Sequence, residues 1–197
     1  MKEICYTNYY WQNELVRLRA LKLEDWENGF GDLYDSKARL MLQYELELPP
    51  VLSAHMKSIE KYSDFDPASG RLMFAIETLE GVMVGGLNLN SIDERNGTFG
   101  IGMQIGGEYR AKGYGTAAMR ILLKYAFLER RLNKYNCSIL EGNIGSGTML
   151  KKLGSVQEGV RRQQVYSDGR YMDIVLFGLT KEDFIKNEEY LSKIDND

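Results

Sequence analysis

The chain has 197 residues, of which 44% are hydrophobic and 27% charged, and its formal net charge is −3. This length favours a single domain spanning 1–197 with its core at about 14–180, and the negative charge argues against a nucleic-acid partner. The only cysteines, Cys5 and Cys137, lie too far apart to suggest a metal site or a disulfide framework, and no apolar run is long enough to span a membrane, so we expect a cytoplasmic protein without metal.

The first part of the chain predicts one strand followed by helices. Residues 15–21 alternate between apolar and polar side chains, which indicates a strand. Residues 22–42 show a helical pattern with breaks, and a second helix is expected over 51–62, where the preceding prolines are tolerated in the first turn. Residues 63–70 have the composition of a loop.

The second part predicts a β section and then alternating elements. In chain order we expect three antiparallel strands at 71–78, 82–92 and 98–105, followed by a helix at 116–128. After these we expect a strand at 136–140, a short helix at 143–153, a hairpin of strands 155–166 and 170–179, and a charged tail helix from 180 onward. The helix 116–128 is apolar nearly all round, so it should be packed on more than one side. The crossover through this helix should make strand 136–140 parallel to strand 98–105.

A basic, glycine-rich loop joins strand 98–105 to helix 116–128. Its sequence is Glu-Tyr-Arg-Ala-Lys-Gly-Tyr-Gly-Thr-Ala at 108–117. Glycines let a ligand approach the backbone, the first helical amides point toward it, and Arg110 and Lys112 add positive charge. This order indicates a cradle for a phosphate or pyrophosphate. The loop lacks the Gly-Lys-Ser/Thr of a P-loop and the third glycine of a dinucleotide fingerprint.

The segment Arg110-Ala111-Lys112-Gly113-Tyr114-Gly115 resembles the Arg/Gln-x-x-Gly-x-Gly/Ala signature of the GNAT acetyltransferase superfamily. Four later motifs follow in the same order as in the branch that includes the ribosomal-protein N-terminal and spermidine acetyltransferases: Glu141-Gly142-Asn143, Lys152-Leu153-Gly154, Glu158-Gly159-Val160-x-Arg162 and Asp168-Gly169-Arg170-Tyr171-x-Asp173. The resemblance covers about 15–179. It implies an α/β (α+β) fold in which helices flank a mixed, largely antiparallel sheet with a splayed central strand pair.

The resemblance also implies a reaction and a set of binding residues. An acetyl group would pass from acetyl-coenzyme A to a primary amine by direct attack in a ternary complex. The acceptor would be a protein N-terminus, a polyamine, an amino sugar or a similar small metabolite, and similar proteins are often homodimers. The residues implied in cofactor binding are Met103, Gln104, Ile105, Arg110, Ala111, Lys112, Gly113, Tyr114, Gly115, Thr116, Asn143 and Lys152.

The catalytic groups are less clearly marked. The attacking amine must lose a proton, and Glu141, at the end of strand 136–140, is the candidate general base; the alternative is a solvated glutamate at a strand end. The resemblance implies that the backbone amide of Ile105 acts as the oxyanion donor. We expect Asp173 to pair with Arg162 rather than to orient a cationic substrate.

One position departs from the family pattern. Where relatives often carry a tyrosine that protonates the departing thiolate, this chain has Leu150. A thiol has a pKa of about 8.5, so its thiolate leaves without a strong acid. Candidate donors are Tyr114, Tyr166 and Ser146. Two alternatives stay open: a coenzyme A-binding protein with little catalytic activity, and a module that binds another phosphorylated ligand.

The helices before residue 62 would form the acceptor wall of such a fold. Asp35, Glu45 and Glu47 give this wall a negative charge that would suit a cationic amine. The single histidine, His55, is expected to be an exposed residue of its helix without metal-binding neighbours.

Overall fold

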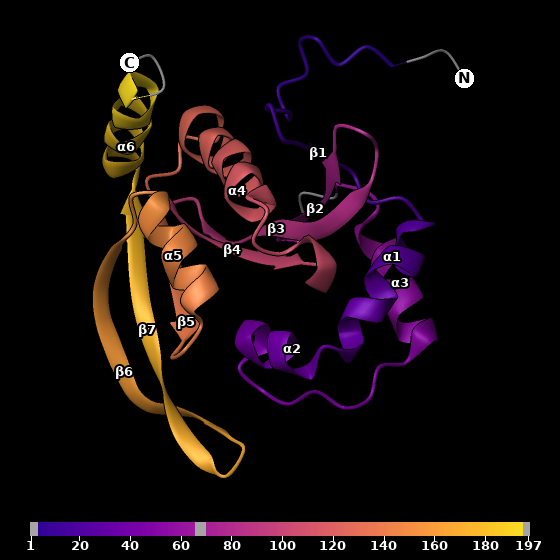
Figure 1. Ribbon diagram of the computed structural model, residues 1–197. Coiled ribbons are helices and arrows are strands. Elements are labelled where there is room, and N and C mark those ends of the chain that lie inside the picture. Colours follow the sequence, from indigo (N-terminus) through magenta and orange to yellow (C-terminus); the bar gives the residue numbers. More distant parts are fainter. Residues whose placement is uncertain (1–3, 66–69, 195–197) are drawn as a thin grey trace.

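Seven strands form one mixed sheet within the described residues, which are 4–65 and 70–194 of a computed structural model (Figure 1). The strand order is β1-β2-β3-β4-β5-β7-β6, and all neighbouring strands are antiparallel except β4 and β5. The strands are β1 Val16–Arg19, β2 Arg71–Thr78, β3 Met83–Asp93, β4 Thr98–Ile105, β5 Lys134–Leu140, β6 Val156–Ser167 and β7 Arg170–Thr180.

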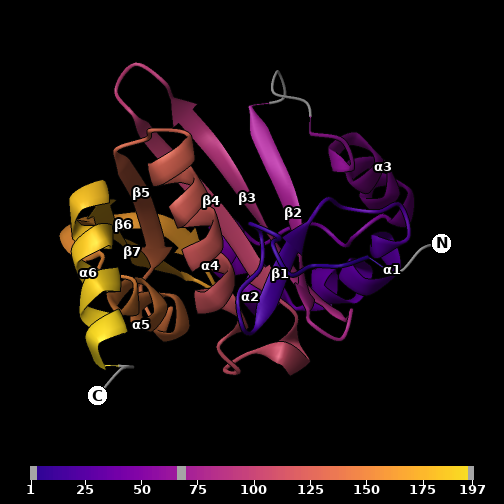
Figure 2. The same cartoon turned by 90° about the horizontal axis from the view of Figure 1, so that it is seen from above.

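Helices lie on both sides of the sheet (Figures 1 and 2). One side carries α4 Tyr114–Lys124, α5 Ile144–Lys152 and α6 Lys181–Ile194. The other side carries α1 Asp25–Phe30, a 3₁₀ helix Gly31–Tyr34, α2 Ser36–Gln43 and α3 Leu52–Tyr62. A second 3₁₀ helix, Gly107–Tyr109, precedes α4, and a π-helical turn, Tyr125–Glu129, follows it.

The main core lies between the sheet and α4. Six residues of α4 are buried, which confirms the prediction of a helix packed on more than one side: Ala117, Ala118, Met119, Ile121, Leu122 and Leu123. From the sheet, Leu18, Ile76, Leu87 and Phe99 are at most 1% exposed. A smaller cluster on the other face joins β5, β6 and β7 to α2.

The sheet opens between its two parallel strands. β4 and β5 pair only at their first residues, and the register ends at Phe99 and Tyr135. Beyond this point β4 stays on β3 as far as Ile105, while β5 stays on β7 as far as Leu140. The parallel crossover and the splayed pair were both predicted from the sequence, and both are present.

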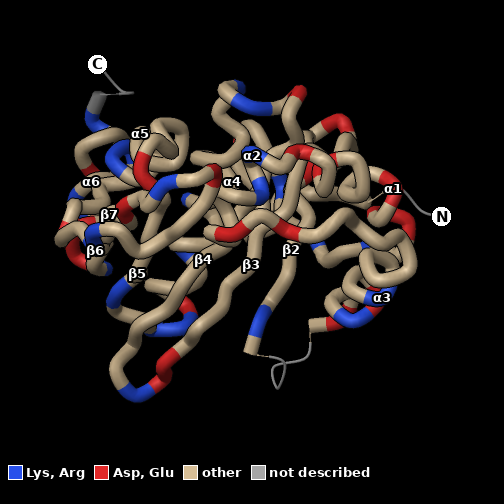
Figure 3. The backbone as a smooth tube through the Cα atoms, turned by 90° about the horizontal axis from the view of Figure 1, so that it is seen from below, with Lys and Arg blue, Asp and Glu red and all other residues tan. Residues whose placement is uncertain are grey.

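Positions of Lys and Arg are interspersed with positions of Asp and Glu along the backbone (Figure 3). At the β1 end of the sheet, a buried cluster joins β1, β2 and α1. Arg19 donates to both carboxylate oxygens of Asp25 at 2.8 and 2.9 Å and to Glu77 at 2.5 Å. Burial raises the pKa of Asp25, but hydrogen bonds from Arg19 and from the Lys22 N–H outweigh it and bring the pKa below its ordinary value.

We expect Asp25→Asn to lower the free energy of unfolding by about 1.5 kcal/mol at pH 7, because a buried, charge-assisted hydrogen bond is lost. The pKa of Asp25 is lower in the folded protein than in the unfolded chain, so its ionised carboxylate stabilises the fold at pH values above the unfolded-state pKa of about 3.9. This stabilisation is lost as the pH falls further. Urea unfolding of both proteins from pH 7 to pH 2.5 tests this, with Asp168→Asn in an exposed turn as the control. A difference that persists undiminished at the lowest pH would contradict the role of charge.

Candidate active site

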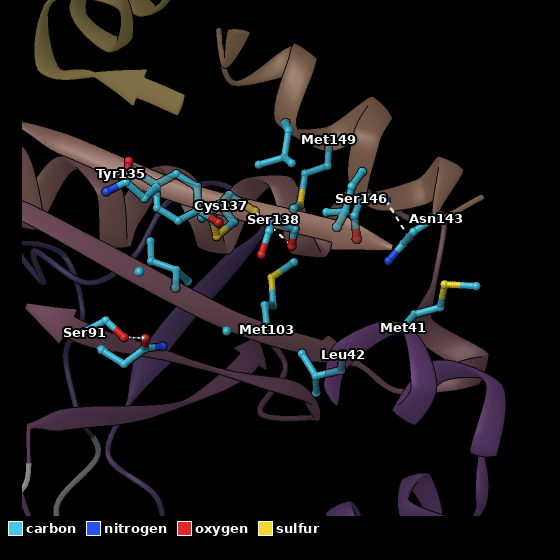
Figure 4. Close-up of a pocket in the computed structure, with 18 of the residues that line it drawn as sticks. Met41, Leu42, Ser91, Met103, Tyr135, Cys137, Ser138, Asn143, Ser146 and Met149 are labelled. Carbon is cyan, nitrogen blue, oxygen red and sulfur yellow. Dashed lines mark hydrogen bonds between the residues drawn. The ribbon is translucent and has the colours of Figure 1, made fainter. Parts of the chain in front are cut away.

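A cavity of about 420 Å³ occupies the gap between β4 and β5 (Figure 4). Its volume lies within the range of small-molecule sites. The side facing α4 and α5 is apolar, with Met103, Met119, Ile139, Met149 and Leu150. The side facing α2 carries polar groups, including Tyr44, Asn90, Ser91, Asn136 and Ser138. The cavity therefore connects the two faces of the sheet through the splayed pair.

Backbone amides of β4 face this gap. The N–H of Gly106 donates to the carbonyl of Val84 on β3 at 3.0 Å. Because N–H directions alternate along a strand, the amides of Ile101, Met103 and Ile105 point away from β3. Pairing with β5 has already ended there, so these amides are directed toward any ligand in the gap.

The expected oxyanion donor, Ile105, lies beyond the lining of the cavity. Ile101 and Met103 line it, while the Ile105 carbonyl accepts a hydrogen bond from Arg110 Nε at 3.0 Å. The Met103 side chain turns toward α4. Its terminal methyl group lies so close to Gly115 of α4 that a Cβ added to this glycine would stand 3.0 Å from it. The amides best placed beside the cavity are therefore those of Ile101 and Met103.

Side-chain amides of β3 cross over glycines of β4. A Cβ on Gly100 would lie 2.8 Å from Asn90 Oδ1, and one on Gly102 would lie 2.8 Å from Asn88 Nδ2. Asn90 donates to Asn88 Oδ1 at 2.6 Å, and the Ser91 hydroxyl donates to Asn90 Oδ1 at 2.8 Å. Sequence reasoning missed this polar row. Its signal was the alternation of asparagines on β3 opposite alternating glycines on β4.

Tyr44 and Cys137 also line the cavity. The Tyr44 hydroxyl, from the end of α2, donates to the Ser138 carbonyl and lies 2.9 Å from Ser138 Oγ. Burial raises the pKa of both the Tyr44 hydroxyl and the Cys137 thiol. Both groups are therefore neutral near pH 7.

The loop before α4 has the backbone expected of an anion cradle. Ala111 and Gly113 have positive φ angles of 61° and 87°. The first hydrogen bond of α4 runs from Ala117 N to Gly113 O, so the N–H groups of residues 114–116 have no partner within the helix. Lys112 is exposed, with its ammonium 5.5 Å from the ring centroid of Tyr109. The loop thus offers free amides and a cation at the open end of β4.

Arg110 contacts α2 as well as the loop. Its Nη1 donates to Asp35 Oδ2 at 2.8 Å, and Asp35 also caps α2 by accepting the Ala38 N–H at 3.0 Å. The Ala38 N–H and Arg110 together lower the pKa of Asp35. The Arg110 side chain, which was expected to serve the phosphates, therefore ties the loop before α4 to α2.

The negative charge expected on the acceptor wall is largely paired. Arg39 forms two 2.6 Å bonds to Glu47 and also donates to Gln104 Oε1 at 3.2 Å. Arg110 pairs with Asp35. Glu45 alone of the three acidic residues has no ion pair among the described residues. The wall therefore offers much less attraction for a cation than its sequence suggested.

The structure does not bring Glu141 to the cavity. Its carboxylate accepts a hydrogen bond from Arg170 at 2.8 Å, and it is absent from the described lining. Its N–H donates to the Asp173 carbonyl at 2.9 Å. The expected pairing of Asp173 with Arg162 is not formed among the described residues, because Asp173 accepts the Gln163 N–H at 2.8 Å where β6 bulges.

Helix α5 brings two polar residues to the cavity. Asn143 caps the helix by accepting the Ser146 N–H at 3.2 Å, and both residues line the cavity. Leu150, at the position where relatives carry tyrosine, is 1% exposed. Lys152 lies at the far end of α5, where its carbonyl accepts a hydrogen bond from Asn187 of α6 at 3.1 Å. Asn143 is thus placed at the site, whereas Lys152 is exposed and outside the described lining of the cavity.

The three candidate proton donors differ in position. Tyr166 is 63% exposed and its ring packs against Tyr171 on the β6–β7 hairpin. Tyr114 is half-buried at the start of α4, outside the lining of the cavity. Ser146 lines the cavity, and its hydroxyl has no recorded partner among the described residues. Ser146 is therefore the candidate that can meet a reacting group.

His55 is half-buried between α1 and α3 rather than exposed, and its ring centroid lies 5.8 Å from that of Phe30. Burial lowers its pKa, and Nε2 has no hydrogen-bond partner within the described chain.

No group of three or more potential metal ligands occurs in the described ranges. None of the helices in those ranges has the length and apolarity needed to cross a bilayer.

The fold and the cavity define a class of protein. A mixed sheet that splays between two parallel strands, with a helix N-terminus beside the opening, is the acyl-coenzyme A N-acyltransferase fold. Residues 16–156 match the family described as Acetyltransferase (GNAT) domain. The chain belongs to this family of N-acetyltransferases, whose members use acetyl-coenzyme A as co-substrate.

Two related sequences and one solved structure of the same fold are similar to this chain. The SPbeta prophage-derived uncharacterized N-acetyltransferase YokL of Bacillus subtilis strain 168 is 30% identical over 90% of this chain and 97% of its own. The ribosomal protein uS5-alanine N-acetyltransferase of Escherichia coli K12 is 27% identical over 43% of each chain. The spermidine N-acetyltransferase of Vibrio cholerae, solved with CoA and spermine, is 19% identical with a TM-score of 0.75, covering 88% of this chain and 99% of its own.

Proposed function

We propose that this protein transfers an acetyl group from acetyl-coenzyme A to a primary amine by direct attack in a ternary complex. The observation that carries the proposal is the cavity through the β4–β5 gap, which reaches both faces of the sheet. A thioester can enter from the α4 and α5 side while an amine enters from the α2 side. The two reactants then meet without a covalent enzyme intermediate.

The residues around the gap fit the co-substrate. Amides of Ile101, Met103 and Ile105 point into the gap and match the amide groups of a pantetheine arm, as an added strand would. Residues 110–116 supply the loop backbone, the free α4 amides and Lys112 for the pyrophosphate. Asn143 accepts a bond from Ser146 through Oδ1, which leaves its amide nitrogen to donate into the cavity.

Acetyl-coenzyme A, when bound, supplies an acetyl group activated as a thioester. The Ile101 and Met103 amides are the donors that would stabilise negative charge on the carbonyl oxygen as the amine attacks. The Ser146 hydroxyl is positioned to hand a proton to the departing sulfur. Tyr44 holds α2 against β5 through Ser138 and so shapes the acceptor side.

The relatives leave the acceptor open, since one is named for a ribosomal-protein alanine and another for a polyamine. What these acceptors share is a primary amine. A single experiment tests the proposal on purified protein by combining thermal unfolding in the presence of coenzyme A with free-thiol release from acetyl-coenzyme A. The amine panel should include an alanine-initiated peptide, spermidine and glucosamine.

We expect coenzyme A at 100 times its Kd to stabilise the fold by about 2.7 kcal/mol, or about 5 to 10 °C in Tm. At least one amine should increase thiol release above the rate without acceptor. Stabilisation without amine-dependent release would favour the alternative, a coenzyme A-binding protein of low activity, for which buried Leu150 is the supporting observation. Absence of stabilisation would remove coenzyme A as the ligand.

A further inference from the structure

The charge of the cavity bears on which amines can react there, given the proposed function. Every described residue that lines it has an uncharged side chain. The polar groups are amides and hydroxyls, among them Asn90, Ser91, Asn136, Ser138 and Asn143. The remaining lining is backbone glycine, methionine and other apolar side chains. A cation that left water for this cavity would therefore lose hydration without meeting a counter-charge.

The titratable groups that face the cavity are Tyr44 from α2 and Tyr135 and Cys137 from β5. Burial raises the pKa of each of them. In their protonated forms these groups are not bases. From β3, β4, α4 and α5 the described lining contributes no titratable side chain.

Glu45 follows the lining residue Tyr44 but is exposed and borders a separate hollow together with Arg39 and Glu47. The other carboxylates near the lining residues are engaged elsewhere. Glu141 binds Arg170, and Asp173 accepts the Gln163 N–H. On α2 and the segment after it, Asp35 binds Arg110 and Glu47 binds Arg39. Two helix ends of opposite partial charge also reach the lining. The positive N-terminal end of α5 lies beside Asn143, and the negative C-terminal end of α2 lies at Tyr44, so the two helix dipoles oppose each other there.

The reaction itself balances without a base if the amine arrives uncharged. The nitrogen lone pair attacks the thioester carbonyl, the carbon–sulfur bond breaks, and the electron pair leaves on sulfur. The nitrogen, now positively charged, gives up one of its protons, and the thiolate takes one, with the Ser146 hydroxyl available as a relay. The products are a neutral amide and a thiol, so no proton needs to leave the site.

We propose that this site acetylates weakly basic primary amines, such as the α-amine of a peptide or an amino-acid amide, and takes them in their uncharged form without a carboxylate base. Strongly basic alkylamines, such as a lysine side chain or a polyamine, are then poor acceptors near neutral pH. At pH 7 roughly one eighth of an α-amine is uncharged, against roughly one in 2,500 of a lysine amine. Selection of the uncharged form alone therefore gives about a 300-fold preference.

The test compares two small acceptors of similar size, alanyl-alanine amide with a free α-amine and Nα-acetyl-lysine amide with a free ε-amine. Thiol release gives kcat/KM for each from pH 6 to pH 10.5. We expect each profile to rise to the pKa of its own acceptor, about 8 and about 10.4. At pH 7 the α-amine should react at least 100-fold faster. Glu141→Gln and Tyr44→Phe should leave both midpoints in place.

A shared midpoint near pH 6 to 7 for both acceptors would overturn the inference, because it would report a base on the enzyme. Comparable kcat/KM for the two amines at pH 7 would do the same, as would a midpoint moved by Glu141→Gln. Each of these results keeps the proposed function, since amine-dependent release still occurs. Coenzyme A binding without release by any amine at any pH would reject the proposed function and the inference with it.

Discussion

Gly113→Ala should weaken coenzyme A binding at least tenfold, whereas Gly81→Ala should leave it unchanged. Gly113 has φ 87° at the start of α4, and Gly81 has φ 88° in the β2–β3 turn. An alanine side chain strains either backbone by about 1 to 2 kcal/mol. At position 113 the loop can relieve the strain only by turning the first amides of α4 away from the ligand. Tenfold weaker binding corresponds to about 1.4 kcal/mol.

The two variants separate loss of the cradle from general destabilisation. Both should lower Tm because the two positive φ angles are nearly equal, and Gly113→Ala should lower it somewhat more, since a Cβ there would also stand 3.3 Å from Leu15 Cδ2 while one at position 81 meets nothing within 4 Å. Isothermal titration with coenzyme A then gives the Kd of each folded protein. Equal affinities in the two variants would show that the loop backbone does not hold the pyrophosphate.

The sequence was informative wherever local pattern decides structure. The residue pattern predicted strands 82–92 and 98–105, and the glycine loop marked the start of α4. The crossover rule then made β4 and β5 parallel. These features depend on residues close together in the chain, or on a handedness that all such crossovers share.

The sequence was uninformative about which charges meet across the fold. Arg110 and Asp35 are 75 residues apart, and no pattern in either segment predicts that they pair. The same holds for Arg170, which pairs with Glu141, the candidate base, from 29 residues away in the chain. The direction of each side chain depends on competing partners, and only the assembled sheet and helices determine them.

These pairings connect the two halves of the site. Arg110 bonds α2 to the end of β4, and Gln104 does so again through Arg39. The loop proposed to hold the co-substrate and the helix that borders the acceptor side are therefore fixed to one strand. In the proposed direct transfer, this shared support would hold the two reactants in a fixed relative orientation.

Ser146→Ala should lower kcat by about 100-fold while the KM for acetyl-coenzyme A stays nearly constant. General acid–base groups contribute about 10²- to 10⁴-fold, and a hydroxyl that relays a proton to sulfur acts only as the carbon–sulfur bond breaks. The Ser146 N–H, not its hydroxyl, makes the capping bond to Asn143 Oδ1, so alanine preserves the start of α5. Steady-state thiol release with the best acceptor of the panel provides the measurement.

Two conservative substitutions serve as controls, because they remove the hydroxyls of the competing candidates. Tyr114 and Tyr166 lie outside the lining of the cavity, so Tyr114→Phe and Tyr166→Phe should leave kcat unchanged. Ser146→Thr keeps a hydroxyl on the same helix and should recover part of the lost rate. If Ser146→Ala turns over like the wild type, or if Tyr114→Phe alone is impaired, the proton reaches sulfur by a route that does not include Ser146.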